Sequence, residues 1–241
     1  MKTARRQFLS ASVTLGITGL VAGPAVLGAD AKEPGSQKEK KEAPEGEEDV
    51  SPAEDLMREH GVLKRIMLIY GEAVRRMEAN EDLPPKALAD AAHIIRSFIE
   101  DYHSKLEEDY VFPRFGKANK LVRLVTVLQE QHEAGRRLTD VTLRLATAEG
   151  LRSANDRRAL SNSLRQFVRM YGPHEAREDT VVFPAFHEIV RGHEYDELGD
   201  AFEKREHELF GREGFEGMVR RVAVIERSLG IFDLSQFTPR S

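Results

Sequence analysis

One pattern occurs twice in this 241-residue sequence and restricts its fold more than any other feature. Residues 103–115 read HSKLEEDYVFPRF, and residues 174–186 read HEAREDTVVFPAF. Each copy begins with His, has Glu four residues later and ends in Val-Phe-Pro-x-Phe. Side chains four residues apart lie on the same face of an α-helix. The repeat therefore predicts two helices that each direct a histidine and a carboxylate toward one place, in a chain built from two related halves.

Four long stretches carry apolar residues at alternating steps of three and four, as amphipathic helices do. Their apolar positions run over residues 56–77, 88–106, 121–145 and 160–171. Ser51, Pro52 and Glu54 form a helix-start signal, and we expect the later helices to end before Pro113, at Gly150 and before Pro184. Because short connections make neighbours antiparallel, the sequence predicts an all-α fold, an up-down-up-down four-helix bundle. Two extra C-terminal helices are expected at 194–210 and 216–229.

The composition excludes several kinds of site. The chain has no cysteine, so disulfides, thiolate metal ligands and cysteine nucleophiles are absent. The formal net charge is −5, whereas nucleic-acid binders normally present a basic face. We therefore expect no nucleic-acid partner.

The N-terminus carries a targeting pattern. Residues 3–10 read TARRQFLS, an apolar run follows at 13–27, and Ala-Asp-Ala stands at 29–31. This order resembles a twin-arginine export signal, with a general secretory signal as the alternative. The run is short and Gly-rich, so we expect cleavage, a periplasmic or otherwise exported protein and no stable membrane anchor.

The chain divides into four predicted parts. Residues 1–31 form the signal peptide, and residues 32–50 form a charged linker with too little apolar surface to fold. Residues 51–190 form the helical bundle, and residues 191–241 form a helical extension.

Four histidines occupy or flank positions where core residues belong. His60, His132 and His174 fall on the apolar stripes, and His103 flanks its own. At about 1.5 Å of rise per residue, all four lie in nearly one layer of the bundle. Any one of them alone would be read as a hydrogen-bonded core histidine, because a buried imidazole needs a partner. Four in one layer favour metal binding.

The spacing suggests two half-sites. His103 lies 43 residues after His60, and His174 lies 42 residues after His132. Each half thus supplies a lone histidine and a His-x-x-x-Glu pair, so that each of two metals receives two imidazoles and the carboxylates can bridge both. Imidazole and carboxylate without thiolate suit iron, with manganese possible.

At this point the sequence resembles the hemerythrin-like family with the HHE cation-binding motif, over roughly residues 51–190. The resemblance implies a four-helix bundle around a non-haem di-iron centre that binds O2 or senses oxygen, iron or nitric oxide. Carried over by position, the metal ligands would be His60, His103, Glu107, His132, His174 and Glu178.

Three positions depart from the oxygen-carrier pattern. Arg136 stands where carriers have a second histidine on the third helix, so one iron would have an open position. Glu178 and Asp179 compete for the bridging role, and the internal repeat favours Glu178. Pro173, beside His174, should kink or bulge the fourth helix.

Other residues carry weaker signals. Glu100 and His103 make one Glu-x-x-His, the ferritin-like signature that should occur twice. We expect His93 to be structural or on the surface, and His187 and His193 to be solvated in a loop. His207 could close over the open iron. Arg136, Arg137, Arg165 and Arg169 are expected on a solvated helix face.

The residues leave the activity open. The first hypothesis is an exported protein that binds O2 or a related diatomic for sensing, storage or protection. The alternatives are a di-iron enzyme that reduces peroxide, nitric oxide or O2, and a protein that handles iron. All three need the same ligands, and no catalytic residue is assigned.

Overall fold

A computed structural model describes residues 50–239 of the chain. Within that range the regular structure is helical and contains no strand, so the prediction of an all-α fold is confirmed. The predicted signal peptide (1–31) lies outside the described residues, as does the predicted linker (32–50) except for Val50. Among the described residues, no helix is long and apolar enough to span a bilayer.

The first long segment is a single helix, α1 (Pro52–Ala79). The hydroxyl of Ser51 accepts a hydrogen bond from the backbone N–H of Glu54 at 3.2 Å, and Pro52 occupies the first turn. Asn80 ends the helix in the left-handed conformation, at φ 52°. The helix start predicted from Ser51, Pro52 and Glu54 is therefore confirmed.

The other long segments are composite. The second comprises α2 (Pro85–Ile94), η1 (Ile95–His103), α3 (Ser104–Leu106), η2 (Glu107–Val111) and α4 (Phe112–Ala118). The third is α5 (Val122–Leu145), followed by the short α6 (Ala148–Arg152). The fourth comprises α7 (Ala154–Arg177), η3 (Glu178–Val182) and α8 (Phe183–Ile189). The pieces η1, η2 and η3 are π-helical, with wider turns than an α-helix.

The helices do not end at the two repeated prolines, which corrects the expectation from the sequence. The N–H of Phe112 bonds to the carbonyl of Glu107, five residues back, and the N–H of Phe183 bonds in the same way to Glu178. This wider turn lies just before Pro113 or Pro184, where a regular α-helix would make the proline ring clash with the preceding turn. Each segment therefore continues for another two turns.

One further helix boundary differs from the prediction, and the helix at Pro173 contains no bulge. The third helix ends at Leu145 and not at Gly150, which lies inside α6 and donates its N–H to the hydroxyl of Thr147. The fourth segment shows no bulge at Pro173, because α7 continues through it. Pro173 is exposed, so the carbonyl that lacks its hydrogen bond lies on the side open to water.

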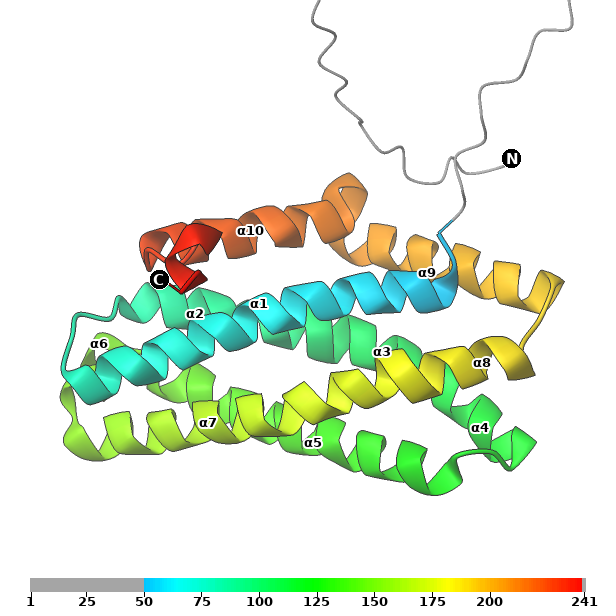
Figure 1. The fold of residues 1–241 in the computed structure, drawn as a ribbon, viewed down its shortest axis with the longest axis horizontal. Coiled ribbons are helices and arrows are strands. Elements are labelled where there is room, and N and C mark those ends of the chain that lie inside the picture. Colours follow the sequence, from blue (N-terminus) through cyan, green and yellow to red (C-terminus); the bar gives the residue numbers. More distant parts are fainter. Residues whose placement is uncertain (1–49, 240–241) are drawn as a thin grey trace, which may run out of the picture. The chain divides into compact units, whose positions relative to one another are not determined.

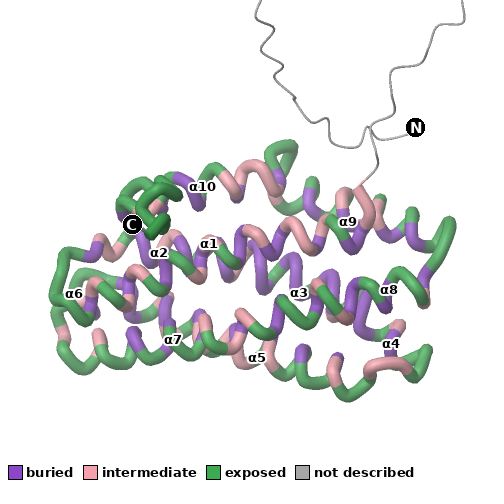
Figure 2. Tube along the Cα trace, in the orientation of Figure 1, coloured by how far each residue is buried: buried purple, intermediate pink, exposed green. Residues whose placement is uncertain are grey.

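The four long segments lie side by side with alternating directions (Figure 1). α1 and α5 run one way, while the second and fourth segments run the other way. α7 packs against both α1 and α5. Among the described residues, 16 polar or charged side chains are buried beside the apolar ones, and 14 of them lie on the four long segments. Figure 2 shows buried stretches, in purple, along each of these segments.

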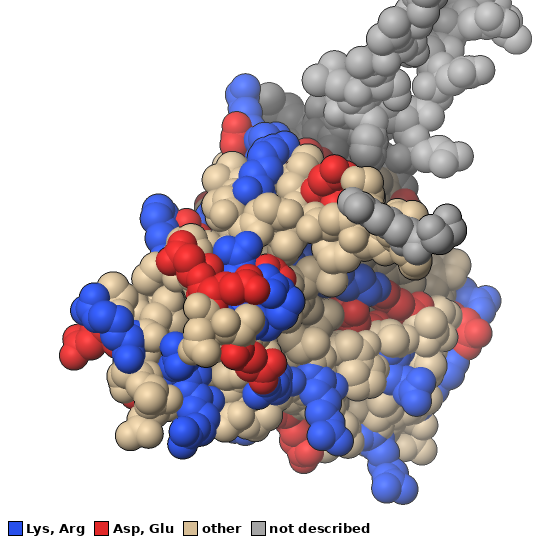
Figure 3. All heavy atoms as spheres, turned by 60° about the vertical axis from the view of Figure 1, so that its left-hand side comes forward, with Lys and Arg blue, Asp and Glu red and all other residues tan. Residues whose placement is uncertain are grey.

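Two more helices cover one side, as the sequence predicts. They are α9 (His193–Phe210) and α10 (Gly214–Ser228). α9 packs against α1, and α10 packs against α1, α2 and α9. On the face shown in Figure 3, basic and acidic side chains are interspersed, so that face has no continuous basic surface.

Candidate metal centre

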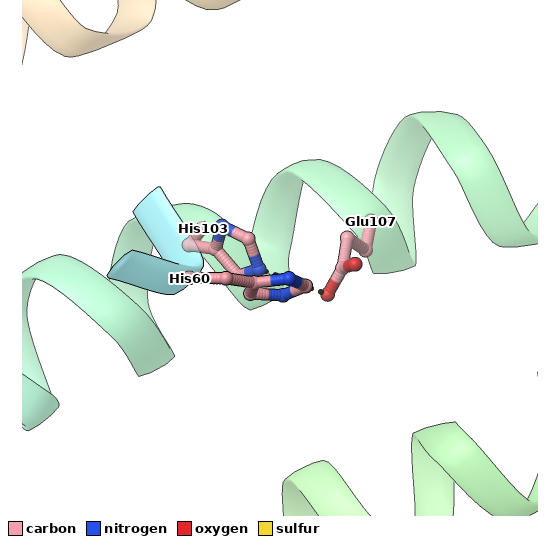
Figure 4. Close-up of side chains that lie close together, drawn as sticks. All are labelled: His60, His103 and Glu107. Carbon is pink, nitrogen blue, oxygen red and sulfur yellow. Dashed lines mark ion pairs between the residues drawn. The ribbon is translucent and has the colours of Figure 1, made fainter. Parts of the chain in front are cut away.

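All six residues proposed as ligands from the sequence meet in the core. They form two groups, His60 with His103 and Glu107, and His132 with His174 and Glu178. Within each group, ligand-type atoms lie within 4.8 Å of one another. No member is more than 3% exposed. The first group, contributed by α1 and the second segment, is drawn in Figure 4.

Each carboxylate lies between imidazoles of both groups. Glu178 is 3.1 Å from Nε2 of His174 in its own group and 3.3 Å from Nε2 of His60 in the other. Glu107 is 3.5 Å from Nε2 of His103 and 3.3 Å from Nε2 of His132. Two carboxylates shared in this way are arranged to serve two neighbouring positions.

The Nδ1 atoms of the four rings point outward and each meets an oxygen of a side chain. The distances are 2.7 Å from His60 to Asp179, 2.8 Å from His103 to Glu59, 3.1 Å from His132 to Glu108 and 2.9 Å from His174 to Gln131. An Nδ1–H that donates to such an oxygen leaves the lone pair of Nε2 free to bind a metal. The outer bonds therefore fix both the orientation and the tautomer that ligation needs.

The positions of these four partners in the sequence are a signal by which they can be found. Each partner is adjacent to one of the predicted ligands. Glu59 and Gln131 precede His60 and His132, and Glu108 and Asp179 follow Glu107 and Glu178. On a helix, adjacent residues project about 100° apart, so one can face the centre while its neighbour reaches around the side of another helix.

The centre is short of positive charge and of hydrogen bonds. The carboxylate oxygens of Glu107 and Glu178 have no well-aligned hydrogen-bond donor, although both side chains are fully buried, and their near neighbours are imidazole Nε2 atoms at 3.1 to 3.5 Å. Burial without a partner costs several kcal/mol for a charged group, on the order of 3–5 where a pair is broken. A cation between the two groups would remove this cost.

The metal-free centre compensates with protons. Burial alone would lower the pKa of His60, but the Asp179 and Glu178 carboxylates raise it to about 10. Burial likewise opposes the charge on His132, whose pKa Glu107 and Glu108 raise to about 9. Burial lowers the pKa of His103 to about 4 and also lowers that of His174.

The two acids respond in opposite directions. Burial and the nearby Glu178 raise the pKa of Glu107. Burial would do the same to Glu178, but its imidazole neighbours, His174 first, lower its pKa. Protonated imidazoles thus supply the positive charge that the carboxylates of the centre need.

Comparison with known proteins decides the family. The model of the hemerythrin HHE cation-binding domain matches residues 51–149 and again residues 123–228. The chain belongs to this hemerythrin family. Two overlapping matches fit a domain of two related halves, and the second extends over α9 and α10.

Relatives of the hemerythrin domain occur in mycobacteria. The uncharacterized proteins Rv1995 of Mycobacterium tuberculosis and Mb2018 of Mycobacterium bovis are each 52% identical to this chain over 196 residues. The similarity covers 81% of this chain and 77% of each relative. No solved structure matches the chain.

Arg136 has a defined place beside the centre, which corrects the expectation of a solvated side chain. It is half-buried and donates to Glu108 Oε1 at 2.7 Å, the same oxygen that faces His132 Nδ1. It also donates to the backbone carbonyl of Glu100. The expectation holds for Arg137, Arg165 and Arg169, which are exposed.

Two phenylalanines of the repeated motif pack against imidazoles of the centre. Phe183 stacks on His60 and Phe112 stacks on His132, each with ring centroids 5.6 Å apart. The first aromatic residue of each Val-Phe-Pro-x-Phe ending therefore covers an imidazole of the opposite half. This apolar cover keeps water from the rings.

Glu100 and Tyr171 occupy matching places three residues before His103 and His174. Glu100 is buried and accepts a hydrogen bond from the Thr139 hydroxyl at 2.6 Å. The Tyr171 hydroxyl is buried without a hydrogen-bond partner, and its ring lies 5.1 Å from that of His174. Only one of the two positions is acidic, so the ferritin-like pattern is absent here.

The other histidines lie away from the centre. His93 and His207 are exposed on their helices, so His207 does not close the site. His187 and His193 are exposed as expected, but they lie in α8 and at the start of α9 and not in a loop. The buried charged residue of α9 is Glu206, the neighbour of His207, and it accepts a hydrogen bond from Phe215 N–H at 2.6 Å.

Proposed function

We propose that this protein is an exported di-iron hemerythrin-like protein that binds O2 or a related diatomic molecule. The metals would be held by His60, His103, Glu107, His132, His174 and Glu178. One observation carries the proposal. The Nε2 atoms of four imidazoles, whose Nδ1 atoms are held by outer hydrogen bonds, converge on the buried carboxylates of Glu107 and Glu178, which have no other hydrogen-bond partner.

The donor atoms fit iron. Neutral imidazole and carboxylate without thiolate suit iron or manganese, and two imidazoles per metal leave places for further ligands. When bound, the two irons would supply redox chemistry and a position for an external ligand. The chain's own part is to hold the imidazoles in one tautomer, to share two carboxylates and to exclude bulk water.

The burial of the centre favours a small ligand. With every ligand residue at most 3% exposed, a diatomic molecule can reach the centre through small fluctuations of packing, whereas a larger substrate needs an open cleft. The four helical segments would form an up-down-up-down four-helix bundle over residues 51–190, with the helices of 191–241 as a lateral cover.

A di-iron enzyme that reduces peroxide, nitric oxide or O2 is the second candidate, and a protein that handles iron is the third. Arg136 favours the enzyme, because it replaces the extra histidine of oxygen carriers and faces Glu108 instead of the centre. Iron-loaded protein mixed with peroxide and a reductant tests this. Reversible ligand binding without turnover supports the binding protein, and sustained turnover supports the enzyme.

Export is proposed on the N-terminal pattern of Arg5, Arg6, the apolar run and Ala-Asp-Ala. The twin-arginine route carries folded proteins, so the metals could be acquired before export. Lys at both arginine positions should retain metal-loaded protein in the cytoplasm. Continued export of that variant would indicate the general secretory route.

A further inference from the structure

The outer hydrogen bonds of the centre repeat with the two halves of the chain. Glu59 and Gln131, which precede the lone histidines, bond to the second histidine of their own half, His103 and His174. Glu108 and Asp179, which follow the two central glutamates, bond across to the lone histidine of the other half, His132 and His60. Four bonds thus form two equivalent pairs.

The two residues of one of these pairs differ in charge. Glu108 and Asp179 are both acids, but Glu59 is an acid where Gln131 is a neutral amide. A carboxylate behind a metal-bound imidazole makes the imidazole a stronger donor and adds negative charge near the metal. The amide holds the ring in place without adding that charge.

The surroundings add to the difference. At the second half-site, the Glu108 carboxylate is bonded by Arg136 at 2.7 Å and by Lys105 at 2.5 Å. At the first half-site, the equivalent Asp179 is reached by Lys64 at the longer distance of 3.5 Å. Together with the carboxylate of Glu59 in place of the amide of Gln131, this makes the first half-site the more negative of the two.

We infer that the two metal positions differ in affinity, and that the position at His60, His103 and Glu107 fills first. Gln131 is then the positioning residue that sets the weaker affinity of the second position, at His132, His174 and Glu178. This inference rests on the proposed function, because it assumes that both half-sites bind metal. It predicts a one-metal form with a defined location.

The test exchanges the two residues that differ. Metal-free protein is titrated with Co²⁺ against a competing chelator, and the metal count is followed by native mass spectrometry. The wild-type protein should bind two Co²⁺ in two separated steps. Gln131→Glu should strengthen the second step roughly ten- to a hundredfold, and Glu59→Gln should weaken the first by a similar factor. The exposed Gln129 supplies the control Gln129→Glu, which should change neither step.

The location is tested by ligand removal. His174→Ala should keep the tight step, whereas His103→Ala should lose it, and the double exchange Glu59→Gln/Gln131→Glu should reverse this result. Two equal steps in the wild-type protein, or steps that ignore the exchange, would overturn the inference alone. A folded protein that binds no Co²⁺ would overturn the proposed function together with it.

Discussion

Asp179 Oδ1 lies 2.7 Å from Nδ1 of His60, and the adjacent Glu178 places Oε2 3.3 Å from Nε2 of the same ring. Two consecutive acidic residues thus face opposite edges of one imidazole. Glu178 is fully buried in the centre, while Asp179 is partly exposed and reaches Lys64 at 3.5 Å. The sequence left both residues as candidates for the bridge. In this geometry Glu178 faces imidazoles of both groups, whereas Asp179 faces the outer edge of His60.

Exchanging each acid for its amide should show which of the two holds the metals and which one only orients His60. Glu178→Gln should reduce the metal content, because the amide cannot neutralise the charge of two metals. Asp179→Asn should keep both metals but lower affinity on the order of ten- to a hundredfold, as loss of an outer partner does. Metal content and chelator competition measure the two effects. Equal losses of metal from both variants would show that the two acids do not have these separate roles.

Removing a ligand should lower stability as well as metal content. His103→Ala should lose most of the bound metal, and its unfolding temperature should fall toward that of metal-free protein. A ligand at a hundred times its Kd stabilises the folded state by about 2.7 kcal/mol. Calorimetry of wild type before and after chelation gives the reference. His93→Ala is the matched control, because His93 is exposed on the same segment and should change neither quantity.

Metal binding should release protons at neutral pH. The pKa values of His60 and His132 lie at about 10 and about 9 in the metal-free protein, so both rings are charged at pH 7. A ligating imidazole must be neutral. Raised pKa values also mean that these charges stabilise the metal-free fold below about pH 6.5, and that this stability is lost as the pH rises through about 9 to 10.

Calorimetric titrations in buffers of different ionisation enthalpy measure the release. We expect net proton release at pH 7 that declines as the pH approaches 10. Uptake of protons on binding, or release that does not change with pH, would show that the imidazoles are neutral before the metal arrives.

The sequence predicted which six side chains come together better than it predicted the ends of the helices that carry them. Alternating steps of three and four on the helices predict which faces are buried, and the repeat predicts the two half-sites. The π-turns were not foreseen, because Pro113 and Pro184 read locally as helix stops. The chain stays helical at both prolines because the π-helical turns that begin at Glu107 and Glu178 make room for the proline rings. The outer partners were also missed, because their contacts join residues from 24 to 119 positions apart.

Gly135 is needed for packing next to the centre. A Cβ atom at this position would lie 2.9 Å from Cε2 of the buried Tyr171 ring and closer still to its hydroxyl. Gly135→Ala should therefore lower the free energy of unfolding by about 1–3 kcal/mol. Gly71→Ala is the control, because nothing lies within 4 Å of its added Cβ. That change should stabilise α1 by about 0.4–1 kcal/mol. Denaturant unfolding compares the two variants.

The metal content of freshly isolated protein tests the central claim most directly. Elemental analysis should find two metal ions per chain, with iron as the main element, and the count should fall when His103 or His174 is replaced by Ala. One metal or none per chain, or a full count in those variants, would contradict the assignment of a two-metal centre to His60, His103, Glu107, His132, His174 and Glu178.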